Sequence, residues 1–371
     1  MKNPIPRSIW VKKGDEKLIE ILDQRFLPHK RVVKTLSSST DCERAIRDME
    51  VRGAPLIGVT AAFGMYFAVL EALESQNFET ELQEKSAFLK SSRPTAVNLM
   101  WAVDIQNSFI QDHKLDDDLP EKVFTQAKKL MEQDVDVCRR LGEHGLNLIK
   151  ALSEKKKGAP VNILTHCNAG SLAVVEWGTA TSPIYQAHLS GIPVHVWVDE
   201  TRPRNQGAHL TAWEMSEAQV PHTLIVDNAG GHLMQHGEVD LVLVGCDRVT
   251  REGDAANKIG TYLKALSAKD NEVPFYVCLP SSTIDWEVRN GLKEIEIEER
   301  GSNEVQYVQG LLRDEVEQVR ICPEKTPALN IGFDVTPARL ITGFITENGI
   351  CNASEEGLSH LFPEQAQIVA K

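Results

Sequence analysis

The stretch DLVLVGCDRVTREGDAANKIG, which runs from Asp240 to Gly260, decides the fold of this chain. Its apolar beginning predicts a buried strand, and the glycine and charged residues that follow mark the carboxyl end of that strand. We expect Gly-Asp-Ala-Ala-Asn-Lys to open a helix. In an open parallel sheet, ligands bind at the carboxyl ends of the strands. Asp247 and Arg248 are therefore expected at a ligand site, with Asn257 and Lys258 within reach of an anion.

Similar short runs of Val, Ile and Leu alternate with helical stretches through the second half of the chain. This alternation predicts a Rossmann-like α/β domain, with a parallel sheet covered by helices on both faces. The charged segment Asp285–Thr326 is expected to form loops that cross the ligand end of this sheet. The expected strands are Val161–Thr165, Pro193–Val198, His222–Val226, Leu241–Val244, Pro274–Leu279 and Arg339–Ile345.

The first half of the chain shows mainly helical periodicity. Short apolar segments at Ser8–Lys12, Leu18–Leu22 and Arg31–Thr35 predict a small β-sheet before it. The charged Glu154–Pro160 segment contains Gly and Pro and is the expected connector. We therefore predict an N-terminal, mainly helical domain over residues 1–153 and a Rossmann-like catalytic domain over 154–371. The expected helices cover Cys42–Glu50, Pro55–Leu73, Thr95–Gln111 and Pro120–Leu152.

The composition and net charge of the chain argue against several classes of protein. The net charge of -13 argues against a nucleic-acid or membrane-surface binder, so an anionic substrate requires a local basic pocket. The seven cysteines include no Cys-x-x-Cys pair, and the histidines show no metal-ligand spacing, so neither disulfides nor a metal site are expected. The apolar run Ile57–Leu73 contains Glu71 and fits a core helix, and no signal-peptide pattern precedes it. We expect a cytoplasmic protein.

Two residues are candidates for proton transfer. Cys167 lies where a predicted strand turns into a helix, and a helix N-terminus lowers the pKa of a thiol, making it a candidate nucleophile or base. A buried, inert thiol is the alternative interpretation. Asp247 follows an apolar strand, where burial raises the pKa of a carboxyl and favours its acid form. Arg248 opposes that shift, and a structural Asp247–Arg248 ion pair is the other interpretation.

Anion binding is expected without a standard phosphate loop. The chain has neither Gly-x-Gly-x-x-Gly nor a Walker A sequence, which argues against a dinucleotide cofactor or ATP. Arg52-Gly-Ala-Pro and Arg93-Pro-Thr instead place an arginine at a predicted helix start, where free N–H groups attract anions. Asn257 and Lys258 are expected in the helix that follows the Asp247 loop.

Ordered motifs over nearly the whole chain resemble those of the methylthioribose-1-phosphate isomerase family. The resemblance implies conversion of 5-methylthioribose 1-phosphate to 5-methylthioribulose 1-phosphate by a homodimer, without a metal or redox cofactor. The motifs are Arg52-Gly-Ala-Pro-Leu-Ile-Gly58, Arg93-Pro-Thr-Ala-Val-Asn98, Thr165-His-Cys-Asn-Ala-Gly170, Asp199-Glu-Thr-Arg-Pro203, Asn205-Gln-Gly207, Gly253-Asp-Ala-Ala-Asn-Lys-Ile-Gly260, Ile297-Glu-Glu-Arg300 and Phe333-Asp-Val-Thr-Pro337.

The resemblance also implies roles for single residues. Asp247 is implied as the proton donor and Cys167 as the second catalytic group. Ring opening of a sugar phosphorylated at C1 needs an acid on the ring oxygen, and hydrogen then moves from C2 to C1. An enolate-like route with a thiolate base and a direct hydride shift both stay open. The residues implied to hold the sugar phosphate are Arg52, Gly53, Ala54, Arg93, Gln206, Asn257 and Lys258.

Other functions are weighed against this one. The same superfamily contains ribose-1,5-bisphosphate isomerases and the non-catalytic regulatory subunits of the initiation-factor exchange complex. 5-Deoxyribose 1-phosphate is a further candidate substrate, because Val174–Trp177 and Arg204-Asn205 depart from the family pattern and could alter the pocket around the sugar's 5-substituent. An NAD-dependent oxidoreductase is disfavoured by the missing glycine fingerprint.

Overall fold

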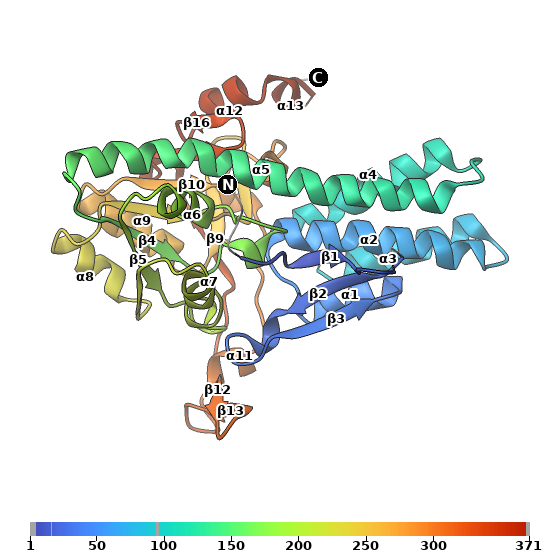
Figure 1. The fold of residues 1–371 in the computed structure, drawn as a ribbon, viewed down its shortest axis with the longest axis horizontal. Helices are drawn as coiled ribbons and strands as arrows, with labels where there is room; N and C mark the ends of the chain where they lie inside the picture. The colour runs from blue at the N-terminus through green and yellow to red at the C-terminus, as the bar shows by residue number, and fades with distance from the viewer. Residues whose placement is uncertain (1–4, 16, 94–95, 369–371) are drawn as a thin grey trace.

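The computed structural model describes residues 5–15, 17–93 and 96–368. A bundle of helices forms one part of the molecule and a helix-covered sheet forms the other, as Figure 1 shows. The expected helix start at Pro94-Thr95 lies outside the described residues. The fold class is α/β, as predicted, with a Rossmann-like sheet and a mainly helical N-terminal part.

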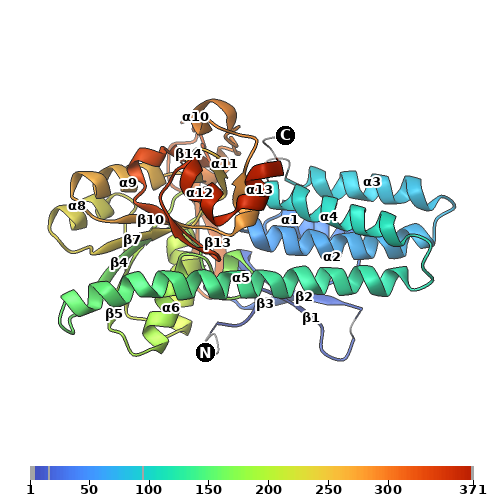
Figure 2. The same cartoon turned by 90° about the horizontal axis from the view of Figure 1, so that it is seen from above.

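The helical part packs around α2 (Ala54–Leu73). This helix is apolar on nearly every side because it lies at the centre of the bundle and its residues are mostly buried (Figure 2). A three-stranded antiparallel sheet borders the bundle, as the sequence predicts. One helix, α3, was not expected. The surrounding elements are β1 (Ile9–Val11), β2 (Ile19–Asp23), β3 (Val32–Leu36), α1 (Ser39–Arg47), α3 (Phe78–Ser91) and α4 (Val97–His113).

The long helix α5 (Leu119–Lys155) connects the two parts of the molecule (Figure 1). Near its start, Val123 and Met131 belong to the core of the helical bundle. Further along, Cys138 and Ile149 belong to the core on one face of the sheet. Since α5 contributes to both cores, it fixes their relative position, and the domain boundary at residue 154 stays a prediction.

All six strands expected in the second half of the chain occur in the main seven-stranded sheet, whose order is β16-β15-β10-β7-β4-β5-β6. Every pairing in it is parallel except that of β15 with β16. The last expected strand begins later than predicted, because a 3-10 turn occupies Ala338–Leu340. The strands are β4 (Val161–His166), β5 (Val194–Asp199), β6 (His222–Ile225), β7 (Leu241–Val244), β10 (Phe275–Cys278), β15 (Gly343–Thr346) and β16 (Gly349–Cys351).

Helices cover both faces of this sheet, because successive strand residues point to opposite sides. Ile163 and Leu243 contribute to the core beneath α5, α6 (Thr181–Leu189) and α7 (Ala212–Glu217), whereas Leu164 and Val244 contribute to the opposite core. The helices of the second face are α8 (Ala229–Gln235), α9 (Thr261–Asp270) and α12 (Glu355–Leu361), followed by α13 (Pro363–Ile368).

The prediction of a helix at Gly253–Lys258 is wrong. The chain forms a hairpin of β8 (Arg248–Thr250) and β9 (Ala255–Lys258), turning at Gly253, whose φ is 94°. These strands belong to a second sheet of order β11-β8-β9-β14, with β11 (Ile284–Asp285) and β14 (Phe333–Thr336). Antiparallel pairing with the distant β14 overrides the local preference, so Asn257 and Lys258 lie on a strand.

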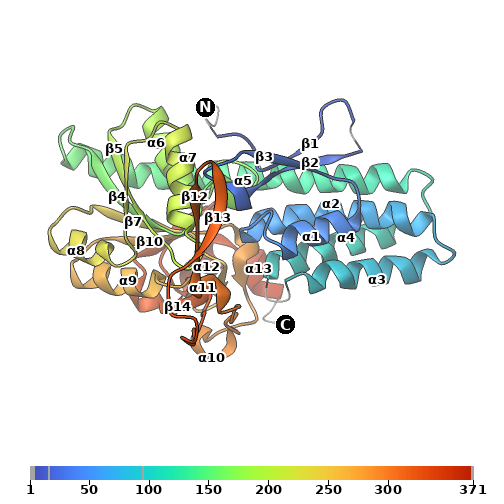
Figure 3. The same cartoon turned by 90° about the horizontal axis from the view of Figure 1, so that it is seen from below.

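The segment 285–326 is more regular than expected. It contains α10 (Gly291–Glu294), α11 (Asn303–Gln306) and a hairpin of β12 (Tyr307–Leu312) and β13 (Glu315–Arg320). The hairpin turns through Arg313 and Asp314 with φ of 49° and 68°, an unusual turn pair without glycine. Figure 3 shows the hairpin over the junction of the helical part and the sheet, where Gln309 donates to the Arg25 carbonyl.

Candidate active site

A cavity lies where the carboxyl ends of β4 and β7 face the beginning of α2. The topology of the sheet explains the position of the cavity, since ligand crevices form outside the carboxyl ends of parallel strands. The structure brings together every site residue predicted from the sequence. The residues that line the cavity include Arg52, Gly53, Ala54, Arg93, Cys167, Gln206, Asp247, Asn257 and Lys258.

The beginning of α2 forms one wall of the cavity. Gly53 caps this helix with a φ of 93°, and no side chain hydrogen-bonds the cap. A Cβ on Gly53 would lie 2.3 Å from the carbonyl oxygen of Ala173, so only glycine lets the two segments approach this closely. Gly53 and Ala54 line the cavity, so the beginning of a 20-residue helix borders it, a place that favours an anion.

Cys167 follows β4 directly, in the left-handed region with a φ of 64°. Its backbone N–H donates to Thr201 Oγ1 at 2.8 Å, and its carbonyl accepts from Thr211 Oγ1 at 2.6 Å. These bonds hold the backbone while the thiol faces the cavity and is 6% exposed. Strained residues that the surroundings fix in this way are typical of functional sites.

The expected helix at Cys167 is absent from the described structure. A turn and a 3-10 helix (Ser171–Ala173) follow, and α6 begins only at Thr181. Burial raises the pKa of the Cys167 thiol, while the charges of Arg52 and Lys258 lower it. The prediction that this pKa is lowered by a helix N-terminus is therefore wrong: burial is the larger effect and raises the pKa, and Arg52 and Lys258 offset only part of that rise.

Arg52 is fixed beside the thiol by Asn168. Its guanidinium donates to Asn168 Oδ1 at 2.9 Å and to the Asn168 carbonyl at 3.1 Å. Asn168 is fixed in turn by the buried Glu214, whose Oε1 accepts from Asn168 Nδ2 at 2.8 Å. Glu214 was not predicted from the sequence. A carboxylate among the apolar residues of Ala-Trp-Glu-Met was the available signal.

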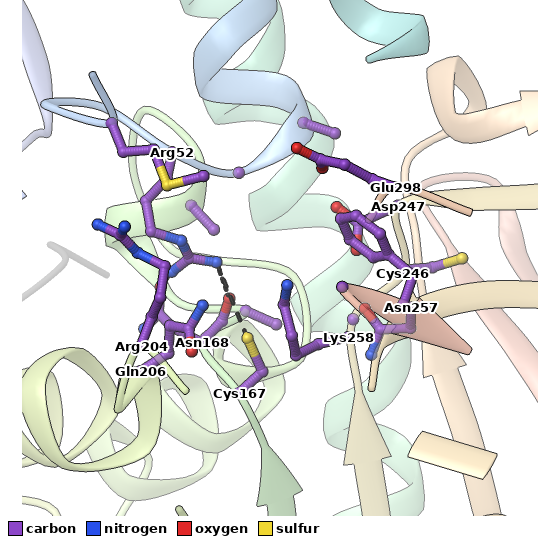
Figure 4. A pocket seen from close by; sticks show the side chains of 18 of the residues that line it. Arg52, Cys167, Asn168, Arg204, Gln206, Cys246, Asp247, Asn257, Lys258 and Glu298 are labelled. Atoms are coloured by element: carbon purple, nitrogen blue, oxygen red, sulfur yellow. Dashed lines mark hydrogen bonds between the residues drawn. The ribbon is translucent and has the colours of Figure 1, made fainter. Parts of the chain in front are cut away.

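Asp247 lies on the cavity wall opposite Cys167, beyond the end of β7 (Figure 4). Burial raises the pKa of its carboxyl, and Lys258, Arg93 and Arg52 lower it. Arg248, the partner in the alternative ion-pair interpretation of Asp247, has its Nη1 3.7 Å from Asp285 Oδ2. The balance of these effects favours an acid form at a higher pH than an exposed aspartate allows.

Lys258 lies between the thiol and the carboxyl (Figure 4). Its ammonium is 4.3 Å from the centroid of the Phe333 ring. Burial lowers the pKa of Lys258, and the negative charges of Cys167 and Asp247 oppose this. Its neighbour Asn257 is held by a 3.0 Å hydrogen bond from Nδ2 to Thr261 Oγ1.

Arg93 belongs to a chain of alternating charges at the rim of the cavity. Arg93 Nη2 lies 3.1 Å from Glu298 Oε2, and Glu298 Oε1 pairs with Arg300 at 2.7 Å. Arg300 then pairs with Glu304 at 2.9 Å, and Glu304 pairs with Arg204 at 2.8 Å. Glu298 belongs to the Ile297–Arg300 motif, but its pairing with Arg93 was not predicted, because 205 residues separate the two. Glu304 was not predicted.

This arrangement can bind an anion and move protons at it. Arg52, Arg93 and Lys258 surround the cavity together with the start of α2, so an anionic group would be held by several donors. Asp247 and Cys167 flank the same space as an acid and a potential base. Among the described residues, no group of three or more His, Cys, Asp or Glu side chains is placed to hold a metal ion.

Comparisons with known proteins agree with this architecture. A family model described as the initiation factor 2 subunit family matches residues 50–353. A curated methylthioribose-1-phosphate isomerase from Desulfatibacillum aliphaticivorans is 55% identical over 359 residues, covering 97% of each chain. Its counterpart from Rhizobium meliloti is 56% identical, covering 96% of this chain and 97% of the relative.

Two solved structures are similar over almost the whole chain. The 5-methylthioribose 1-phosphate isomerase from Pyrococcus horikoshii OT3 matches with a TM-score of 0.83 and 38% identity, covering 97% of this chain and 96% of the other. The delta subunit of translation initiation factor eIF-2B from A. fulgidus matches with a TM-score of 0.79 and 34% identity, covering 97% and 100%.

Proposed function

The chain belongs to the initiation factor 2 subunit family, and we propose that it is an isomerase that converts 5-methylthioribose 1-phosphate to 5-methylthioribulose 1-phosphate in methionine salvage. The observation that carries the proposal is the placement of Cys167 and Asp247 on two sides of Lys258 in one cavity. Curated relatives at about 55% identity are named for this activity.

The phosphate is expected to bind at the basic end of the cavity. Arg52 and Arg93 supply planar guanidinium groups, Lys258 supplies an ammonium, and Gly53 and Ala54 supply the start of α2. Gln206 and Asn257 line the same cavity and offer hydrogen bonds to the sugar hydroxyls. Before substrate binds, Glu298 serves as the partner of Arg93.

Asp247 is proposed as the acid that opens the sugar ring. Its carboxyl proton passes to the ring oxygen as the bond from that oxygen to C1 breaks. A carboxyl can do this at neutral pH only if it retains a proton, and burial raises the pKa of Asp247 in that direction. After ring opening, Asp247 carries the negative charge, close to the ammonium of Lys258.

Cys167 is proposed to serve the transfer of hydrogen from C2 to C1. Ring opening leaves an oxocarbenium ion at C1. As a thiolate Cys167 would accept the proton from C2, leaving a neutral enol phosphate, and return that proton to C1 while the C2 hydroxyl gives its own proton to the Asp247 carboxylate and becomes the ketone. Burial raises the pKa of this thiol, and the charges of Arg52 and Lys258 oppose that rise and so increase the fraction of thiolate. In the alternative hydride shift, Cys167 shapes only the electrostatics of the cavity. Deuterium from heavy water at C1 of the product would support the proton route.

A second candidate function is a non-catalytic regulatory subunit. It is favoured by the similarity to the eIF-2B delta subunit from A. fulgidus. The presence of both Cys167 and Asp247 in one cavity favours the enzyme. Ribose 1,5-bisphosphate is disfavoured as a substrate because Arg204, the extra cation at the rim, already pairs with Glu304 at 2.8 Å.

The decisive experiment compares kcat/KM of the purified protein for three substrates. We expect 5-methylthioribose 1-phosphate to be converted best, 5-deoxyribose 1-phosphate more slowly, and ribose 1,5-bisphosphate least. No turnover of any of the three would favour the regulatory subunit. Preference for the bisphosphate would overturn the proposed substrate while retaining the reaction type.

The homodimer and the cytoplasmic location are part of the same proposal. Both are implied by the resemblance to the isomerase family. Light scattering of the eluting protein should give about twice the chain mass of 41.3 kDa. A mass equal to that of one chain would contradict the dimer.

A further inference from the structure

His166, the residue before Cys167, connects two strand ends that lie far apart in the sequence. Its Nδ1 is 2.5 Å from Asp199 Oδ2, at the end of β5. Its Nε2 is 2.8 Å from the carbonyl oxygen of Ile259, just beyond β9. Both partners accept hydrogen bonds, so a ring that donates from both nitrogens satisfies them. The side chain is 1% exposed and does not line the cavity.

Asp199 and Lys264 hold the His166 ring on the side of Nδ1. Asp199 is fully buried, and its Cα is the register partner of His166 in the parallel pair β4–β5. Lys264 Nζ lies 2.8 Å from Asp199 Oδ2 and also donates to the carbonyl of Asp227. Buried charges are costly unless paired in this way, so loss of one partner is strongly opposed. The ring therefore has little freedom to move.

The backbone after Lys258 packs closely against the His166 ring. Gly260 has a φ of 102°, and a Cβ there would lie 3.1 Å from His166 Cε1 and Nε2. The Gly260 N–H donates to Asp334 Oδ2 at 2.7 Å, which holds this backbone from the other side. A glycine is needed at this position because of both its backbone conformation and its close approach to the ring.

We propose that His166 is a positioning residue that sets the distance between the thiol of Cys167 and the ammonium of Lys258. His166 is one residue before Cys167, and its partner Ile259 is one residue after Lys258, so a single side chain connects the two segments. The inference rests on the proposed function only for its catalytic consequence. A misplacement of about 1 Å costs on the order of 10²-fold in rate.

The first test measures the thiol directly and requires no turnover. For each protein, the absorbance of the Cys167 thiolate is measured over a range of pH, as the difference from the same protein carrying Cys167→Ser. The proteins are the wild type, His166→Phe, Lys258→Met and the double variant. If His166 holds Cys167 against Lys258, His166→Phe raises the pKa of the thiol by about half a unit or more, as Lys258→Met does. The double variant then adds little to either single change.

The second test measures kcat and KM for 5-methylthioribose 1-phosphate. We expect His166→Phe to lower kcat at least tenfold and to change KM less than threefold, on the order expected for misplaced catalytic groups. His166→Gln can donate to only one of the two acceptors and should retain more activity, which also guards against misfolding of the phenylalanine variant. His195→Phe is the matched control, because His195 lies on β5, does not line the cavity, and has its Nε2 3.0 Å from Thr223 Oγ1 on β6.

The outcomes separate the two proposals. An unchanged thiol titration in folded His166→Phe overturns the positioning role, whatever the turnover. A wild type that fails to convert the substrate overturns the proposed function, while the thiol titration still decides the role of His166. Thermal unfolding of each variant establishes that the compared proteins are folded.

Discussion

Arg52 Nη2 lies 4.0 Å from the sulfur of Cys167, and the same guanidinium donates two hydrogen bonds to Asn168. The bonds to Asn168 prevent the guanidinium from turning away from the thiol. Burial and positive charge therefore act on one group in opposite directions, since burial raises the pKa of Cys167 and Arg52 lowers it. The fraction of thiolate depends on this contact.

Arg52→Gln should raise the pKa of Cys167, because a cation 4.0 Å from the sulfur is lost. Turnover should fall at least tenfold, since less thiolate is present and the phosphate loses a ligand. The thiol pKa is measured from thiolate absorbance against Cys167→Ser. Arg139→Gln is the control, because Arg139 pairs with Asp136 and Glu143 on the exposed face of α5. An unchanged thiol pKa in Arg52→Gln would contradict this prediction.

Glu298→Gln should change the pH profile of kcat/KM. The charge of Glu298 raises the pKa of Asp247, so its removal lowers that pKa. Activity requires protonated Asp247 together with thiolate, and an aspartate normally titrates well below a thiol. The acidic limb should therefore move to lower pH, and kcat/KM near neutral pH should fall. Glu315→Gln, at an exposed pair with Lys30, should leave the profile unchanged. An acidic limb that moves to higher pH would refute this assignment.

Gly53→Ala should disrupt the beginning of α2 and abolish phosphate binding. The added Cβ would lie 2.3 Å from the Ala173 carbonyl oxygen. The matched control is Gly191→Ala, because Gly191 also has a positive φ, of 77°, but has nothing within 4 Å of the added atom. The control should lose on the order of 1 kcal/mol of stability from backbone strain alone and retain its activity. Equal losses of activity in both variants would argue against a role for the close approach.

Asp134, on α5, should make stability depend on pH. Burial raises the pKa of its carboxyl to about 7, although Oδ2 accepts the Val175 N–H at 2.7 Å. The folded protein therefore binds a proton that the unfolded chain has released. Stability should fall as pH rises from about 4 to about 7, by on the order of 2 kcal/mol from this group.

The check for Asp134 is chemical unfolding at a series of pH values. Asp134→Asn keeps an oxygen acceptor for Val175 but cannot ionise, so its stability should fall less over that range. Asp136→Asn, on the exposed side of the same helix, should behave like the wild type. If wild type and Asp134→Asn show parallel curves, Asp134 does not carry this pH dependence.

Six of the seven strands of the main sheet were predictable because most of them are short runs of branched apolar residues, as in Leu-Val-Leu-Val of β7. The seventh strand, β16, is only Gly-Ile-Cys and was not predicted. The strand β9 was not predicted either, since Ala-Ala-Asn-Lys has no strand preference and depends on pairing with β14, a segment 75 to 81 residues away. The helix α3 was missed because it buries only Leu82, Ser86 and Leu89, too narrow an apolar stripe to stand out.

The residues that face the cavity were predictable from motifs at strand ends and helix starts. Their supporting partners were not, because these arise from contacts between distant segments. Asn168 Nδ2 reaches Glu214 across 46 residues, and Arg93 reaches Glu298 across 205. The environment of Cys167 was mispredicted for the same reason, since local sequence suggested a helix, and the charges that act on the thiol come from Arg52 and Lys258.

The acid Asp247 and the thiol Cys167 are proposed to act on one bound sugar phosphate. The most direct measurement is turnover of 5-methylthioribose 1-phosphate by Asp247→Asn and by Cys167→Ala, with equilibrium binding of the substrate measured on the same folded samples. We predict that kcat falls on the order of 10²-fold or more in each, while the dissociation constant changes only a few-fold. Turnover at the wild-type rate in either variant would contradict the account.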